Sequence, residues 1–288
     1  MNPVVDILLP AALAFIMFAL GLTLVVEDFR RVFARPRAIA IGLFGQIVLL
    51  PAAAYVVAQI FRLPVEMAVG LMILAACPGG VSSGLITHLA RGETALSISL
   101  TAVTSVAAVA TVPFVVDRAL AHFTGVGIAA ELSVARLVRG VFLLTTVPVA
   151  VGMALRHFRP ALTARIGKGA ERLATALFVL IVVATFVNQR QALFDHLADI
   201  GPAAALLNLL VMGGGFALAA AAGLALRDRI AIAAECGLQN AALGIFVAAS
   251  VLQAPAMTIP SVVYAFLMNV SAITFIFYLR SHRRAVAV

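Results

Sequence analysis

Tryptophan is absent from this chain of 288 residues, tyrosine occurs only three times, and only 11% of the residues are charged. Soluble domains average about 25% charged and roughly 45 to 50% apolar residues, whereas 64% of this chain is hydrophobic. One buried core does not need so much apolar material. The length alone would allow two soluble domains, but the scarcity of charge and the recurring apolar runs predict one polytopic membrane domain over residues 1–288.

Cysteine is also scarce, and the two cysteines, Cys77 and Cys236, both lie deep inside apolar segments. A cysteine in such a place is most often a small buried apolar residue, so a disulfide framework is not indicated. The formal net charge is +8. The basic residues lie in short clusters between apolar runs instead of on an aromatic-bearing face, so nucleic acid is not an expected partner.

The apolar runs are long enough for helices of about 20 residues, which cross a hydrocarbon layer of roughly 30 Å. We predict nine spans, at residues 4–26, 37–60, 66–90, 94–117, 132–155, 172–189, 201–226, 230–252 and 259–279. The first run has no lysine or arginine before it and no clear cleavage site, so we expect a spanning helix there and not a cleaved signal peptide.

The positions of the basic residues predict the orientation in the membrane. Nine spans place the termini on opposite sides. With the N-terminus outside, five of the 20 lysine and arginine residues face outwards, namely Arg62, Arg118, Arg136, Arg139 and Arg190. Because inner loops are enriched in positive charge, we expect the N-terminus outside and the C-terminus in the cytoplasm.

Two of the predicted spans carry residues that interrupt a helix. The third contains Pro78-Gly79-Gly80, where proline removes a backbone donor and the glycines lower helix propensity. The eighth contains Glu235-Cys236-Gly237-Leu238-Gln239-Asn240 at its middle, although a charge at the centre of a bilayer costs about 2.5 to 3.5 kcal/mol on insertion scales. Such a cluster predicts a cavity, an ion or a partner group.

These interrupted spans occupy matching places in the order of the helices and cross the membrane in opposite directions. This pattern is typical of secondary transporters built from inverted repeats, whose broken helices form the substrate and ion site at the midplane. We predict inverted repeats at about 4–117 and 172–279, joined by a helix at 132–155.

One short motif suggests a different function. Gly80-Val81-Ser82-Ser83-Gly84 fits the G-x-S-x-G pattern of a nucleophile elbow, and His88 follows it. An elbow needs a strand before the serine, whereas a membrane helix is predicted there. An intramembrane serine protease is a better competitor, but His88 is the only histidine within a predicted span and lies near the end of the same helix as the serines. Catalysis is therefore not expected.

Oxygen-bearing side chains lie close to both breaks. Ser97 and Thr101 are spaced i and i+4 and share one helix face, and with Ser83 they could line a site for a hard cation, which prefers oxygen ligands. Serine and threonine in membrane helices also commonly bond to their own backbone. A lone intramembrane Glu235 has no base at matching depth, so protonation or a bound cation would neutralise it, and the nearby oxygens favour a cation.

Taken together, four motifs resemble the bile acid:sodium symporter family: IMFALGLTL (16–24), GQIVLLP (45–51), CPGGVSSGLITHLARGETALSISLTAV (77–103) and ECGLQNAALG (235–244). The resemblance covers about residues 8–279 and is closest to a nine-helix form. It implies core and panel domains, at about 37–117 and 201–279 for the core and 4–26 and 132–189 for the panel. It also implies that sodium binding, where the broken helices cross, is coupled to uptake of organic anions by alternating access.

The resemblance implies two sodium sites and a neighbouring substrate site. The first sodium site would use Ser83, Ser97, Thr101 and Glu235, and Gly84 replaces an asparagine that is common in the family, which removes one side-chain oxygen. The second would use the side chains of Gln46, Glu235 and Gln239 with the backbone carbonyls of Cys236 and Leu238. The substrate would meet Asn240 and Asn269, in a cavity made less polar by Val81 and Gly84.

The sequence therefore predicts a membrane transporter and not an enzyme. We expect a sodium symporter of the inner (plasma) membrane that imports an organic anion, either a bile-acid-like steroid or a smaller carboxylate. A carrier coupled to protons or working as an exporter is the alternative, suggested by Gly84. The cysteines could in principle bind a soft ion, as in related arsenite carriers. A sensor that binds the ligand without moving it is also open.

Overall fold

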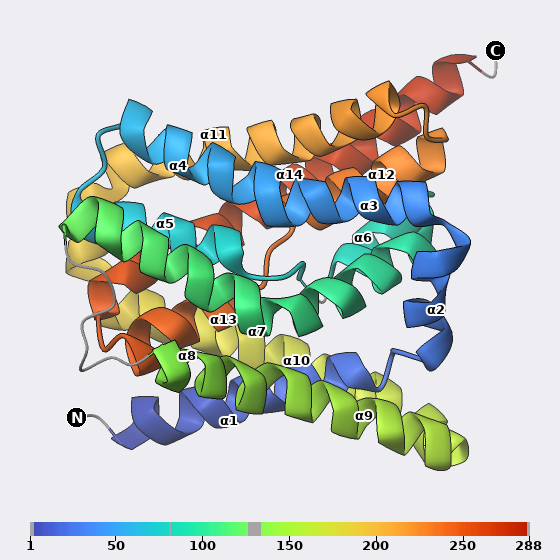
Figure 1. The fold of residues 1–288 in the computed structure, drawn as a ribbon, viewed down its shortest axis with the longest axis horizontal. Helices are drawn as coiled ribbons and strands as arrows, with labels where there is room; N and C mark the ends of the chain where they lie inside the picture. Colours follow the sequence, from blue (N-terminus) through green and yellow to red (C-terminus); the bar gives the residue numbers. More distant parts are fainter. Residues whose placement is uncertain (1–2, 81, 126–133, 287–288) are drawn as a thin grey trace.

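The computed structural model describes residues 3–80, 82–125 and 134–286 (Figure 1). Throughout these ranges the regular structure is helical, and the only extended pairing is one antiparallel bridge between Gly79 and Gln239. The predicted all-α fold class is therefore confirmed.

Six helical stretches of the described chain are long and apolar enough to cross a membrane. Three are single helices: α7 (Thr94–Thr124), α10 (Pro160–Asn188) and α11 (Arg190–Ala221). The others join consecutive elements: α3 (Pro36–Phe44), η1 (Gly45–Leu49) and α4 (Leu50–Ile60); α8 (Val134–Val141), η2 (Phe142–Thr146) and α9 (Val147–Phe158); and η4 (Pro255–Thr258) and α14 (Ile259–Val286).

The remaining predicted spans consist of shorter helices: α1 (Pro3–Gly21), the pair α5 (Val65–Ala76) and α6 (Ser83–Leu89), and the series α12 (Leu226–Gly237), α13 (Ala241–Phe246) and η3 (Val247–Val251). A short helix with polar and apolar faces, α2 (Val26–Ala34), follows α1. The two interruptions lie at the places that the sequence predicted, so both expected broken helices are present.

Two long helices contain a π-helical turn just before a proline. Pro51 follows η1 and Pro148 follows η2. Proline has no N–H to donate to the carbonyl four residues earlier. In both helices the turn before the proline is a π-helical turn, which is wider than an α-helical turn. Gln46 lies in η1 and is buried.

Several helices extend further than their apolar runs indicated, and three of them show it clearly. The helix expected from residue 172 begins at Pro160, the one expected from residue 201 begins at Arg190, and α7 continues to Thr124 instead of ending at residue 117. The added turns carry charged or polar side chains. Hydrophobicity measures the length of helix that fits the hydrocarbon layer, so it misses turns that continue beyond that layer.

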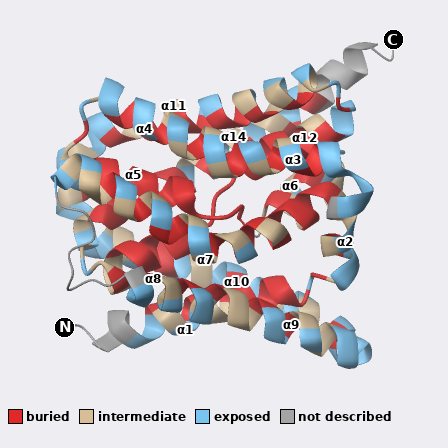
Figure 2. Ribbon diagram, in the orientation of Figure 1, coloured by how far each residue is buried: buried red, intermediate tan, exposed pale blue. Residues whose placement is uncertain are grey.

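Packing divides the described helices into neighbouring groups. In Figure 1, α1 and α9 lie along one side of the molecule, and α1 contacts both α9 and α10. Elsewhere α5 contacts α4, α7 and α14, while α12 contacts α11, α6 and α7. Figure 2 shows the buried residues concentrated around the two interrupted helices, at the centre of the molecule. The core and panel domains and the inverted repeats stay predictions.

Large apolar side chains also point away from the protein interior. Phe114, Leu209 and Phe277 are each about two-thirds exposed, at 67%, 65% and 68%. They lie on long helices, where a hydrocarbon environment would cover them. Exposure on this scale fits a protein surrounded by lipid and not by water.

Candidate functional site

The two interrupted helices meet at their breaks, near the middle of the molecule (Figure 1). The backbone N–H of Gly80 donates to the carbonyl of Leu238 at 2.6 Å, and the N–H of Asn240 donates to the carbonyl of Pro78 at 3.0 Å. A helix break frees donors and acceptors that would be costly to bury unpaired. Here, each broken helix supplies partners for the other.

The first break follows from the sequence Cys77-Pro78-Gly79. Cys77 has an extended backbone, with φ −69° and ψ 151°, because a residue before proline is disfavoured in the helical region. A Cβ atom at Gly79 would overlap the carboxylate of Glu235. Glycine therefore allows the carboxylate to lie directly against the backbone of the other broken helix.

Three hydroxyl groups surround the carboxylate of Glu235, which is fully buried. Thr101 donates to Oε1 at 2.7 Å and Ser97 donates to Oε2 at 3.1 Å. Ser83 lies 3.2 Å from the Thr101 hydroxyl and 3.4 Å from the Ser97 hydroxyl. The first set of predicted ion ligands is therefore brought together, from α6, α7 and α12.

A second polar cluster joins Gln46 to Gln239. The Nε2 of Gln46 donates to Oε1 of Gln239 at 2.7 Å and to the carbonyl of Cys77 at 3.1 Å. The Nε2 of Gln239 donates to the carbonyl of Cys236 at 2.8 Å. Leu238, predicted to join this set through its carbonyl, instead bonds to the backbone of the first break.

The two clusters have the chemistry of a site for a hard cation. They present carboxylate, hydroxyl, amide and carbonyl oxygens, which such cations prefer. Glu235 forms no ion pair with any described residue. A bound cation would therefore neutralise a buried charge that no side chain of the described chain neutralises. The carboxylate itself contacts the first cluster, and the backbone carbonyl of Glu235 contacts Gln239.

Of the predicted substrate residues, only Asn240 is held at the crossing by a described side-chain contact. Its Oδ1 accepts from the N–H of Leu243 and caps α13 at 3.1 Å, and its Nδ2 lies 3.6 Å from the sulfur of Met17 in α1. Asn269 is exposed on α14 and donates to the carbonyl of Ala265 in its own helix.

The remaining two predicted positions lie at the beginning of α6. Gly84 is half-buried, and a Cβ there would lie 3.5 Å from Ile98, which is ordinary contact. Val81 lies outside the described residues.

The structure gives no support to the hydrolase interpretation of this segment. Ser83 is bonded to the hydroxyls that surround Glu235. His88 is exposed, and no described histidine bonds to Ser82 or Ser83. Ser82, the serine that fits the elbow pattern, is the half-buried N-cap residue of α6. Its neighbour Ser83 belongs to the polar cluster at the crossing.

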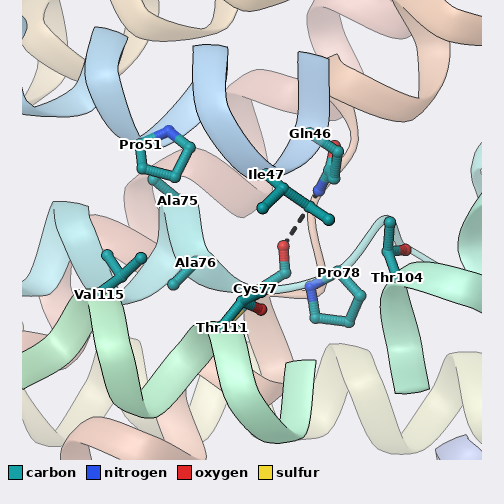
Figure 3. Close-up of a pocket in the computed structure, with 10 residues that line it drawn as sticks. All are labelled: Gln46, Ile47, Pro51, Ala75, Ala76, Cys77, Pro78, Thr104, Thr111 and Val115. Atoms are coloured by element: carbon teal, nitrogen blue, oxygen red, sulfur yellow. Dashed lines mark hydrogen bonds between the residues drawn. The ribbon is translucent and has the colours of Figure 1, made fainter. Parts of the chain in front are cut away.

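A small pocket lies beside the second cluster, between η1 and α4, the end of α5, and α7 (Figure 3). Gln46 lies on its wall and bonds to the Cys77 carbonyl there, while Thr104 and Thr111 add hydroxyl groups. Gln46 thus belongs both to the second cluster and to the wall of this pocket.

Two residues at the crossing were not anticipated from the sequence. Asn208 in α11 and Tyr264 in α14 both donate to the carbonyl of Gly237, at 2.8 and 3.1 Å. A signal existed for Asn208, because an asparagine interrupts the apolar run LLNLLVM at 206–212 and polar residues inside membrane helices are costly. The hydroxyl of Tyr264 gave no comparable signal.

Comparison with known proteins identifies the family. A model of the sodium bile acid symporter family matches residues 10–196, which is more than half of the chain. The chain belongs to this family. The match includes Gln46, Ser83, Ser97 and Thr101. The fold brings the three hydroxyl residues together with Glu235, and Gln46 together with Gln239, both of which follow the matched region.

Individual relatives of the sodium bile acid symporter family also match. A probable chloroplastic sodium/metabolite cotransporter of rice (Oryza sativa) is 27% identical over 256 residues, covering 89% of this chain and 60% of the rice protein. An uncharacterized sodium-dependent transporter of Bacillus subtilis is 29% identical over 259 residues, covering 90% of this chain and 78% of that protein. The human sodium-dependent organic anion transporter is 36% identical over 101 residues, covering 35% of this chain and 27% of the human protein.

These matches test the prediction that the protein is a transporter and not an enzyme. The chain spans only about 60% of the rice relative's length. The names of the sodium bile acid symporter family and of these relatives describe transporters and not enzymes, in agreement with the prediction from the sequence.

Proposed function

We propose that the protein is a sodium-coupled symporter that imports a small organic anion across the inner (plasma) membrane, with its N-terminus outside. The observation that carries the proposal is the environment of Glu235. This carboxylate is fully buried at the crossing, has only hydroxyl side-chain partners among the described residues, and lies against the glycine of the opposite break. The names of the relatives, which describe sodium-dependent transporters, support the same proposal.

Sodium would couple to the anion through the backbone of the two breaks. An ion at the carboxylate and hydroxyl cluster, and a second at the glutamine pair, would remove the cost of the buried negative charge. The ions would also hold α6 and α12 together, because the ligands come from both broken helices. A crossing fixed in this way favours anion binding, and by thermodynamic linkage the anion favours sodium binding to the same extent.

The anion would bind next to the half-helices that begin after the breaks. The N-terminus of a helix carries a partial positive charge and free N–H groups, which favour an anionic group. Asn240 lies at the beginning of α13 and contacts Met17 of α1. Movement of the group formed by α1, α9 and α10 past the crossing would then expose the site alternately to the two sides of the membrane.

The test is uptake into proteoliposomes, using an anion first identified in a thermal-shift screen. Steroid carboxylates and smaller carboxylates are screened in sodium and in potassium, and a compound that stabilises only in sodium is then radiolabelled. We expect an inward sodium gradient to drive uptake, and Glu235→Gln to abolish it. Glu66→Gln, the same exchange at an exposed acid in α5, is the matched control. Uptake that is equal in sodium and potassium, or unchanged by Glu235→Gln, would contradict the proposal.

A proton-coupled carrier is the second candidate. It is favoured by one observation: Gly84 supplies no side-chain oxygen to the first cluster, so the side-chain ligands are three hydroxyls and a carboxylate that could itself carry a proton. Uptake driven by an inward proton gradient in sodium-free medium would support this candidate. No response to that gradient, together with a response to sodium, excludes it.

A further inference from the structure

The carbonyl of Gly237 is held by two side chains from other helices. Asn208 of α11 donates to it at 2.8 Å and Tyr264 of α14 donates to it at 3.1 Å. The same Nδ2 of Asn208 also lies 3.0 Å from the tyrosine oxygen. Both side chains are buried, with exposed fractions of 2% and 0%. Two donors from different helices thus converge on one backbone oxygen at the break.

Gly237 needs these donors because the helix ends there. In a continuous helix its carbonyl would accept from the N–H of Ala241, but that N–H instead donates to the carbonyl of Gln239 at 3.0 Å. A buried carbonyl without a partner is costly. The two side chains therefore replace the helix bond that the break removes.

The neighbouring carbonyls have different partners. The carbonyl of Cys236 accepts from the side chain of Gln239, and that of Leu238 accepts from the N–H of Gly80. Gly237 is the last residue of α12 and Leu238 is extended, with φ −112° and ψ 102°, so the chain leaves the helix directly after the Gly237 carbonyl. The side chains of α11 and α14 thus hold the middle carbonyl of the three, while the carbonyls on either side bond to groups at the crossing.

We infer that Asn208 and Tyr264 are positioning residues for the ion site. By fixing the carbonyl of Gly237, they set the peptide planes on both sides of it and keep the carbonyls of Cys236 and Leu238 turned towards the crossing. This inference rests on the proposed sodium-coupled function. It adds two residues that do not touch the ion and that determine how strongly the unwound backbone can bind it.

The experiment is a sodium titration of the purified protein at constant ionic strength, with the melting temperature measured at each sodium concentration. Tyr264→Phe keeps the ring and removes only the hydroxyl, and Asn208→Leu keeps a similar volume and removes the amide. We expect each to raise the half-saturating sodium concentration about threefold or more, since each removes a hydrogen bond to the carbonyl. The double variant is expected to raise it at least tenfold. Tyr55→Phe, which removes an exposed hydroxyl bonded to His122, is the matched control and should leave it unchanged.

A purely structural role gives a different pattern. In that case melting temperatures fall equally in sodium and in potassium, and the half-saturating sodium concentration stays at the wild-type value. That result would overturn the inference while leaving the proposed function intact. If the wild-type protein itself is not stabilised by sodium, both are overturned. Tyr264→Phe, the milder change, provides the measurement if Asn208→Leu does not fold.

Discussion

The two breaks meet in space, but they contribute different kinds of groups to the crossing. The first, at Pro78-Gly79-Gly80, contributes backbone groups and free space. The second, at residues 235–240, contributes a carboxylate and two amide side chains. The carboxylate of the second break fits only because the first break has no side chain at Gly79.

The half-helices that follow the two breaks also differ in how their N-termini are capped. The half-helix after the second break has a side-chain cap, because Asn240 accepts from Leu243. The half-helix after the first break, α6, begins at Ser83, and its N-cap residue Ser82 makes no side-chain cap bond. The first break thus contributes through the side chain that it lacks, and the second contributes through the side chains that it carries. Each of the following variants tests one side of that contrast.

The largest effect is expected for Gly79→Ala. The added methyl group would overlap the Glu235 carboxylate, and overpacking of this kind costs about 1 to 3 kcal/mol. We expect stabilisation by sodium to be lost and the melting temperature in potassium to fall. Gly213→Ala is the control, since a Cβ there meets no atom within 4 Å. Thermal scans of both variants in the two salts make the measurement, and wild-type behaviour of Gly79→Ala would refute the contrast.

The next effect concerns the amide pair. Gln46→Leu removes the donor to Gln239 and to the Cys77 carbonyl. Because a lost hydrogen bond to a buried group costs about 1 to 3 kcal/mol, we expect the half-saturating sodium concentration for uptake to rise about tenfold. Gln59→Leu, an exposed position near the end of α4 in the same membrane-spanning stretch as Gln46, should leave sodium dependence unchanged. Equal effects of the two substitutions would argue against an ion site at the amide pair.

A smaller effect separates the capping role of Asn240 from its proposed contact with the anion. Asn240→Ala removes the cap of α13, at a cost of about 1 kcal/mol. Asn240→Ser restores a good capping residue but shortens the side chain. We expect the serine variant to regain stability, measured by thermal denaturation, while its anion uptake stays low. If uptake recovers together with stability, the asparagine acts only as a cap.

The smallest effect is an increase in sodium affinity, which we expect for a substitution at Gly84. Asparagine at this position would restore an oxygen to the first cluster, and there is room for its Cβ beside Ile98. We expect Gly84→Asn to lower the half-saturating sodium concentration a few-fold, with Gly84→Ala as the control without the oxygen. Sodium titration of the two variants tests this prediction. Equal half-saturating sodium concentrations in both would show that the missing side-chain oxygen is unimportant for sodium binding.

Much of this architecture could be predicted from the sequence. The apolar runs indicated the spans, and proline and glycine at 78–80 indicated the first break, because both act on the local backbone. Helix ends were harder to place. Turns with Arg165 or Lys168 are polar yet continue α10 beyond its apolar run, and hydrophobicity does not register them.

The candidate site was predictable where side chains carry the chemistry. Ser97, Thr101 and Glu235 can be recognised in the sequence because they are polar residues within apolar runs. In the structure they lie together as expected. The hydrogen bonds from Asn208 and Tyr264 to the Gly237 carbonyl were not predictable from the sequence. The acceptor is a backbone atom, and the donors come from helices that are distant in the sequence. Asn269 could not be placed either, since the direction in which a helix presents a residue depends on packing.

The most direct test of the central claim is equilibrium binding of radioactive sodium to the purified protein in detergent, without any anion. If the crossing of the two breaks is an ion site, the wild-type protein will bind sodium saturably, potassium will compete weakly, and Glu235→Gln will lose the binding while Glu66→Gln keeps it. Saturable sodium binding that survives unchanged in Glu235→Gln, or no saturable binding by the wild-type protein, would contradict the account.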